Sequence, residues 1–180
     1  IELMSETLSG IPSIIYGLFG MIFFVVFLKW DYSLMAGAAT AAIMVLPTIL
    51  STTKEALDAV PDSYREGSFA LGTGKLRTIF KVVLPAAVPG ILSGIILAIG
   101  RIVGETAALL YTSGTATRGL TKGLMSSGRT LAVHMYTISS EGFHTKQTFA
   151  TAVILLIFVF IINTLSSVAA KQISKKAGGQ

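Results

Sequence analysis

The chain has 180 residues, of which 52% are hydrophobic and 13% charged, and its formal net charge is +5. Soluble domains carry about 25% charged residues, so this composition excludes an ordinary soluble domain and indicates an integral membrane protein. In such a protein an excess of positive charge sets the orientation in the membrane or attracts an anionic lipid or substrate. We therefore expect no nucleic-acid partner.

Four apolar stretches are each long enough to cross about 30 Å of hydrocarbon as a helix. They run from about residue 11 to 28, 33 to 50, 88 to 112 and 149 to 170. The second is rich in Ala and Gly, which predicts close packing against other helices. We therefore predict an all-α integral membrane protein with four transmembrane helices.

The charges between these stretches predict an orientation. An even number of crossings places both chain ends and residues 51–87 on one side of the membrane. That side carries eight basic residues: Lys54, Arg65, Lys75, Arg77, Lys81, Lys171, Lys175 and Lys176. The other side carries five: Lys29, Arg118, Lys122, Arg129 and Lys146. The positive-inside rule then predicts that residues 51–87 and the C-terminus are cytoplasmic.

Residues 62–85 predict a helix, a glycine turn and a second helix at the membrane surface. A helix is expected from Tyr64 to Leu71, with Asp62 or Ser63 as its N-cap. Gly72 and Gly74 end that helix because glycine adopts positive φ without steric cost. A second amphipathic helix follows, with its apolar stripe at Leu76, Ile79, Phe80 and Val83 and its predicted end at Leu84-Pro85.

The spacing within this segment resembles the EAA loop of ABC-importer permeases. The matching positions are Glu66, Gly67 and Ser68, then Gly72, and finally Leu84 and Pro85. Gly67 and Ser68 replace the two alanines of the family pattern, and Val82 replaces its isoleucine. The resemblance implies that this loop docks into a cleft on an ATP-hydrolysing subunit. An ordinary amphipathic loop between two helices is the alternative.

Two charged residues lie within the predicted crossings, Arg101 and Glu105, both in the third. A charge at the centre of a bilayer costs about 2.5–3.5 kcal/mol even on insertion scales. Four residues apart on one helix, the two are predicted to pair on a face that also carries Gly90 and Gly94. The pair either fixes helix register or forms a gate on an anion path, since Arg has more donors than one carboxylate uses.

A polar stretch, residues 113–148, contains an amphipathic segment around Leu131 to Ile138. Its basic residues are Arg118, Lys122, Arg129 and Lys146, against the single acid Glu141. They either help to receive an anion or belong to an ordinary solvated loop. His134 and His144 lack the spacing of metal ligands, and we predict no metal site and no cofactor.

Residues 9–17, SGIPSIIYG, and residues 100–108, GRIVGETAA, resemble signatures of phosphate-importer permeases. The continuation LLYTSG at 109–114 is more similar to the PstA-type subunit than to its PstC-type partner. The resemblance covers residues 1–180 and implies a type I, MetI-like helix bundle of six transmembrane helices, the first two of them upstream of Ile1. It also links Arg101 and Glu105 to phosphate passage.

The partners implied are a second permease subunit, two ATPase subunits, an extracytoplasmic phosphate-binding protein, phosphate and membrane lipid. The chain is expected to be a transport subunit and no enzyme, because it has no Walker-type phosphate loop. An importer for another oxyanion, such as sulfate or molybdate, is one alternative. An ion-coupled secondary transporter or channel that uses Arg101 and Glu105 as a relay is another.

Overall fold

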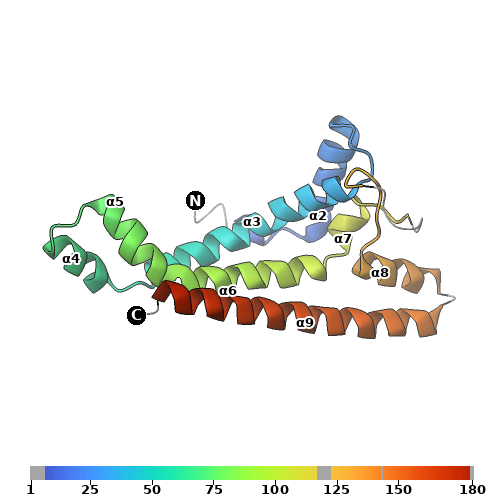
Figure 1. Cartoon of the computed structure of the whole chain (residues 1–180). Coiled ribbons are helices and arrows are strands. Elements are labelled where there is room, and N and C mark those ends of the chain that lie inside the picture. Colours follow the sequence, from blue (N-terminus) through green and yellow to red (C-terminus); the bar gives the residue numbers. More distant parts are fainter. Residues whose placement is uncertain (1–6, 117–122, 143, 179–180) are drawn as a thin grey trace.

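A computed structural model describes residues 7–116, 123–142 and 144–178, and all regular secondary structure in the described part is helical (Figure 1). In chain order the helices are α2 (Ser13–Gly20), the π-helical η1 (Met21–Phe27), α3 (Leu34–Asp58), α4 (Asp62–Ala70), α5 (Lys75–Thr78), the π-helical η2 (Ile79–Val83), α6 (Leu84–Val103), α7 (Ala107–Leu110), α8 (Leu131–Glu141) and α9 (Thr145–Gly178).

Three helices in the described part are long and apolar enough to cross a membrane. They are Leu34–Asp58, Lys75–Val103 and Thr145–Lys175, with 25, 29 and 31 residues. The first predicted crossing is shorter than expected, because its apolar helix covers only Ser13–Phe27, which is about 22 Å at 1.5 Å per residue. Its C-terminal limit is set by Lys29 and Asp31, whose φ angles of 55° and 52° are incompatible with a continuing helix.

The third crossing also differs from the prediction at both ends. Leu84-Pro85 was expected to end a helix, yet α5, η2 and α6 form one continuous helix through Pro85. The π-helical turn directly precedes Pro85, and such irregular turns accommodate the hydrogen bond that a proline removes. At the other end the helix stops at Val103 instead of near residue 112, and residues 104–106 separate it from α7.

The core is built around the contact between α3 and α6. A Cβ at Gly90 would lie 2.6 Å from Cβ of Ala56, so the two helices approach more closely there than a larger residue permits. Gly94 faces Thr52 in the same way, and Ala98 is buried one turn further on. The small-residue face predicted from the sequence is therefore confirmed as a helix-packing surface.

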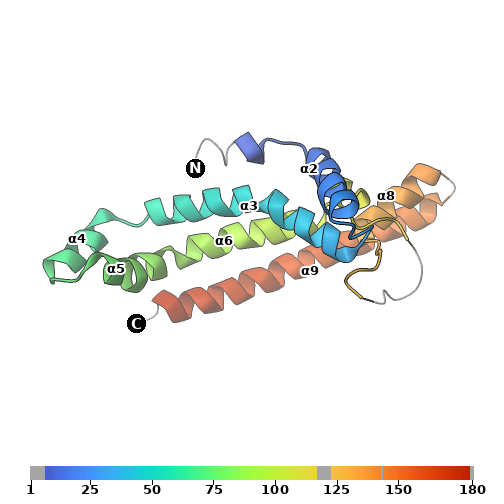
Figure 2. The same ribbon diagram turned by 90° about the horizontal axis from the view of Figure 1, so that it is seen from above.

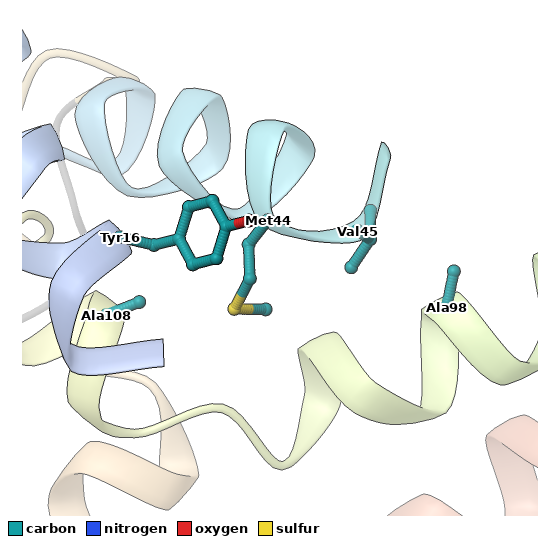
Figure 3. Packing of buried hydrophobic residues seen from close by; sticks show 5 residues of the cluster. All are labelled: Tyr16, Met44, Val45, Ala98 and Ala108. Atoms are coloured by element: carbon teal, nitrogen blue, oxygen red, sulfur yellow. The ribbon is translucent and has the colours of Figure 1, made fainter. Parts of the chain in front are cut away.

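A hydrophobic cluster extends this contact to α2 and α7 (Figure 3). It consists of Tyr16, Met44, Val45, Ala98 and Ala108. The Tyr16 hydroxyl donates a hydrogen bond to the carbonyl of Leu8 at 2.8 Å, so its polar end is satisfied. Four helices thus share one core at the end of the molecule that holds α7.

The two ends of the bundle carry different elements (Figures 1 and 2). The α4–α5 hairpin extends beyond α3 and α6 at one end, where α9 also finishes, whereas α8 lies at the opposite end. Residues 123–130 close that opposite end, with the N–H groups of Leu34 and Met35 donating to the carbonyls of Ser126 and Leu124. The amphipathic segment predicted near Leu131 is α8. The α4–α5 segment and the C-terminal end of α9 therefore lie at the same end of the bundle, and the side of the membrane that this end faces stays a prediction.

The α3–α6 contact predicts the effect of one added methyl group. Gly90→Ala should destabilise the protein by about 1–3 kcal/mol, because overpacking forces the helices apart. Ala56→Gly in the same chain should recover most of this loss, since it removes the atom that the new Cβ meets. Thermal unfolding of the two single variants and the double variant measures both effects, and the absence of recovery would contradict this account of the packing.

Candidate functional site

The α4–α5 hairpin ends its first helix by a specific backbone arrangement. Gly72 has φ of +75°, as predicted, and its N–H donates to the carbonyl of Phe69 at 2.8 Å. The N–H of Thr73 donates to the carbonyl of Ser68 at 3.2 Å. These two bonds form a Schellman motif, which requires a left-handed residue after the helix. Gly74, by contrast, is extended with φ of −71°, so only one of the two glycines supplies positive φ.

The two short helices are joined by a pair of buried hydroxyl groups. The Ser68 and Thr78 hydroxyl oxygens lie 2.9 Å apart, and the Thr78 hydroxyl is also 3.3 Å from the carbonyl of Gly74. A large side chain at position 68 would push α4 away from α5. The small residue predicted there therefore has a packing reason, and Ser adds a hydrogen bond.

Arg65 fixes the hairpin to the end of α3. Its guanidinium donates to the carbonyls of Leu57 at 3.0 Å and Val60 at 3.3 Å, and it pairs with Asp62 at 2.6 Å. The carbonyls at a helix C-terminus lack partners within the helix, so a cation there satisfies them and complements the helix dipole. Sequence reasoning counted Arg65 only as a topology charge. Its position three residues after Asp62 was the available signal.

The remaining predicted loop residues are distributed over the hairpin and its base. Glu66 is exposed, and a Cβ at Gly67 would meet nothing within 4 Å, so this edge of α4 is open. Leu84 and Pro85 are half-buried at the start of α6. The six predicted residues therefore do not form one cluster, because Leu84 and Pro85 belong to the base and the others to the tip.

The tip of the hairpin exposes large apolar side chains. Leu71 and Leu76 are 87% and 73% exposed, and Phe69 and Phe80 also face outward. Exposed apolar residues in a cluster mark an interaction surface more often than a solvated loop. The hairpin thus offers a partner an apolar tip with the acid Glu66 on its edge.

Arg101 lies in the last turn of α6 and does not pair with Glu105, contrary to the prediction. Its Nη1 donates to the Thr48 hydroxyl of α3 at 3.4 Å, and the guanidinium is half-buried. The predicted pair required four residues of continuous helix, and α6 ends at Val103. Arg101 therefore sits near the end of its span, where a cation complements the helix dipole.

Glu105 lies in the short linker after α6 and is 8% exposed. Its Oε1 accepts a hydrogen bond from the backbone N–H of Ala108 in the first turn of α7 at 3.1 Å. Among the described residues the side chain therefore acts as a cap for α7. Ala108 in turn packs against Gly17, where an added Cβ would lie 2.8 Å from Cα of Ala108.

Sequence reasoning missed two polar residues that pack near the C-terminal end of α6. Thr48 receives its hydrogen bond, and Asn163 of α9 faces Gly100, with Oδ1 3.2 Å from the position of a Cβ there. Oδ1 of Asn163 is buried and has no hydrogen-bond partner within the described residues. An unpaired buried acceptor is costly, so this amide oxygen is open to a donor beyond the described residues. A lone Asn in an apolar run was the available signal.

The basic residues within 113–148 give less evidence about anion binding. Arg129 donates twice to the carbonyl of Thr115, at 2.7 and 3.0 Å, and lies 2.9 Å from Nδ1 of His134. It therefore braces the described part of this stretch. Arg118 and Lys122 lie outside the described residues, and the described residues contain no group of three or more His, Cys, Asp or Glu side chains that could hold a metal ion.

Comparisons with known proteins place this geometry in context. The model of the family described as binding-protein-dependent transport system inner membrane component matches residues 1–178. A phosphate transport system permease protein PstA from Yersinia pestis is 39% identical over 168 residues, which cover 92% of this chain and 56% of that protein. A phosphate transport system permease protein PstA 2 from Mycobacterium tuberculosis is 38% identical over 158 residues, covering 87% and 52%.

The probable ABC transporter permease protein YqgI from Bacillus subtilis is 36% identical over 149 residues, covering 76% of this chain and 51% of that protein. The chain thus spans about half the length of these relatives. Among solved structures, the methionine ABC transporter MetNI in an inward-facing conformation matches with a TM-score of 0.72 and 20% identity. That match covers 95% of this chain and 73% of that one and shows a shared fold.

The hairpin geometry predicts different outcomes for its two glycines. Ala has room at both Gly67 and Gly72, but only Gly72 has positive φ. Gly72→Ala should therefore cost about 1–2 kcal/mol locally, and Gly72→Val more, whereas Gly67→Ala should be neutral or stabilising. Amide hydrogen exchange over residues 62–78 measures this, and equal protection in both alanine variants would refute the assignment.

Proposed function

Because the chain belongs to the family of binding-protein-dependent transport system inner membrane components, we propose that it is part of the permease subunit of an ATP-driven phosphate importer. The choice of phosphate as the substrate rests on the similarity of this chain to relatives named phosphate transport permeases, one of which matches over 92% of the chain. Three long apolar helices and a protruding hairpin agree with this role.

The α4–α5 hairpin is the proposed contact with the ATPase subunits. Its exposed apolar tip, with Glu66 on the edge, fits a cleft on a soluble partner. The end of the bundle that carries it, together with the end of α9, would then be cytoplasmic. ATP hydrolysis is assigned to those partners. A PstC-type permease subunit and an extracytoplasmic phosphate-binding protein complete the proposed assembly.

Arg101 is the proposed contact for the anion. A guanidinium has five N–H donors in a planar fork, and one of them is used by Thr48 in the described structure. The remaining donors suit a phosphate oxygen. Glu105 is proposed as a positioning residue, since its contact with Ala108 orients α7 against α2.

An importer for sulfate or molybdate remains the nearest alternative, because the same donors suit any tetrahedral oxyanion. A proton or ion relay is less well supported, since Arg101 and Glu105 use separate partners. The assembled transporter in liposomes distinguishes the oxyanions. ATP hydrolysis should rise with the phosphate-loaded binding protein and not with sulfate or molybdate, and stimulation by sulfate alone would overturn the proposed substrate.

The proposed orientation can be tested with cysteines, because the chain has none of its own. Leu71→Cys in the exposed hairpin tip should react with an impermeant thiol reagent only after the membrane is opened. Ser140→Cys, exposed on α8, should react in intact cells. The reverse pattern would exclude a cytoplasmic hairpin and with it the importer.

The roles of Arg101 and Glu105 can be separated by conservative variants. Arg101→Lys keeps the charge but loses the planar fork, so phosphate uptake should fall at least tenfold while assembly is retained. Glu105→Gln keeps an oxygen that accepts from Ala108, so both assembly and uptake should stay near the parent level. Uptake of phosphate into proteoliposomes is the measurement. Normal uptake by the Lys variant would remove Arg101 as an anion contact.

A further inference from the structure

The hydroxyl of Thr48 on α3 is bonded differently from two other threonine hydroxyls of the same helix. Thr40 and Thr52 each donate their hydroxyl hydrogen to the carbonyl four residues earlier, at 2.8 and 2.9 Å. This bond satisfies a helical threonine locally. Oγ1 of Thr48 instead accepts a hydrogen bond from Nη1 of Arg101 at 3.4 Å, and among the described residues its own hydrogen has no acceptor. The Thr48 hydroxyl therefore has an unused donor.

This unused donor lies well inside α3, one of the candidate membrane spans. Thr48 is 14 residues after Leu34 and 10 before Asp58, which places it about 21 Å and 15 Å from the two helix ends. Its side chain is half-buried, so part of it is accessible. An unpaired polar hydrogen within an apolar span is costly, and an acceptor from outside the described residues would remove that cost.

Arg101 brings further donors to the same point from α6. Its guanidinium has five N–H groups, of which Thr48 uses one in the described structure. The Arg101 side chain is also half-buried, and it forms no ion pair with a carboxylate of the described residues. A cation beside a hydroxyl donor, with no carboxylate to accept from either, favours an anionic acceptor.

The close contact of α3 with α6 fixes these two donors relative to each other. Gly94 faces Thr52, and Ala98 is buried one turn closer to Arg101. These small residues let the two backbones approach, so the side chains of Thr48 and Arg101 meet directly. Donors that are already held in place bind a ligand with a smaller loss of conformational entropy than mobile ones.

We propose that Thr48 is a second contact for the transported oxyanion, with its hydroxyl donating to one oxygen while the unused N–H groups of Arg101 donate to another. A lone pair of Oγ1 accepts from Arg101 and the hydroxyl hydrogen bonds the anion, so both sides of the hydroxyl are satisfied together. A tetrahedral oxyanion presents oxygens in several directions and suits donors from two helices. The inference rests on the proposed function, because it concerns the anion that Arg101 is proposed to bind.

The proposed contact joins the anion to both helices that carry the α4–α5 hairpin. Arg65 fixes the hairpin to the end of α3, the helix of Thr48. The other arm of the hairpin continues into α6, the helix of Arg101. An anion bound by Thr48 and Arg101 would therefore be held by the same two helices on which the hairpin acts.

The first test compares Thr48→Val with Thr48→Ser in the full-length permease of the assembled transporter. Val has nearly the shape of Thr without the hydroxyl, so assembly and the stimulation of ATP hydrolysis by the phosphate-loaded binding protein should stay near the parent level. Phosphate uptake into proteoliposomes per ATP hydrolysed should fall about tenfold, the effect of one lost hydrogen bond to a charged group. Ser keeps the hydroxyl and should restore most of the uptake. Normal uptake by the Val variant, or no recovery with Ser, would overturn the proposal.

Thr53→Val is the matched control for this loss. It removes another half-buried hydroxyl of α3, which has no guanidinium bonded to it among the described residues. Its phosphate uptake should stay near the parent level. A loss equal to that of Thr48→Val would show that α3 tolerates no lost hydroxyl, and the assignment of Thr48 to the anion would fall.

The approach of the anion is measured directly with Thr48→Cys, because the chain has no cysteine of its own. In a complex whose partner subunits also lack cysteine, a small anionic thiosulfonate reagent should modify this residue during ATP turnover. Millimolar inorganic phosphate should slow that reaction severalfold. No modification, or modification that phosphate leaves unchanged, would overturn the contact. Equal protection by sulfate would support the contact and overturn the choice of phosphate, so the two proposals fail separately.

Discussion

The close approach of α3 and α6 through Gly90 and Gly94 is the contact on which the rest of the molecule depends. At one end of this helix pair it brings the Thr48 hydroxyl within 3.4 Å of Arg101. At the other end it sets the base of the hairpin, where Val60 packs with Val83 and Ala87. Both candidate sites are therefore built on one rigid pair of helices.

The continuity of the helix from Lys75 to Val103 has a mechanical consequence. The second arm of the hairpin and Arg101 belong to the same helix, about 40 Å apart along its axis. Arg65 fixes the hairpin to α3, and the Ser68–Thr78 contact fixes its two arms to each other. In the proposed transporter, a displacement of the hairpin would act on Arg101 through helices, without an intervening flexible loop.

The sequence predicted the features that depend on local chemistry and missed those that depend on tertiary contacts. Hydropathy identified the long spans, and the glycine at 72 identified the turn, because each follows from the residues themselves. The end of α6 was missed, since glycine is common inside transmembrane helices and nothing local marks Gly104 as a terminus. The break follows from α7 packing against Gly17, a residue far away in the sequence. The partners Thr48 and Asn163 were missed for the same reason.

The end of α6 at Val103 changes the physical basis for a functional role of Arg101. On the sequence alone, its functional interpretation rested on the cost of a charge at the bilayer centre. In the last turn of α6 that cost is lower, because the helix dipole favours a cation there. An anion contact is supported instead by the hydrogen-bond donors that the Arg101 guanidinium leaves unused. Arg101 has donors beyond the one that Thr48 uses, and in the proposed transporter these donors are open to the oxygens of an anion.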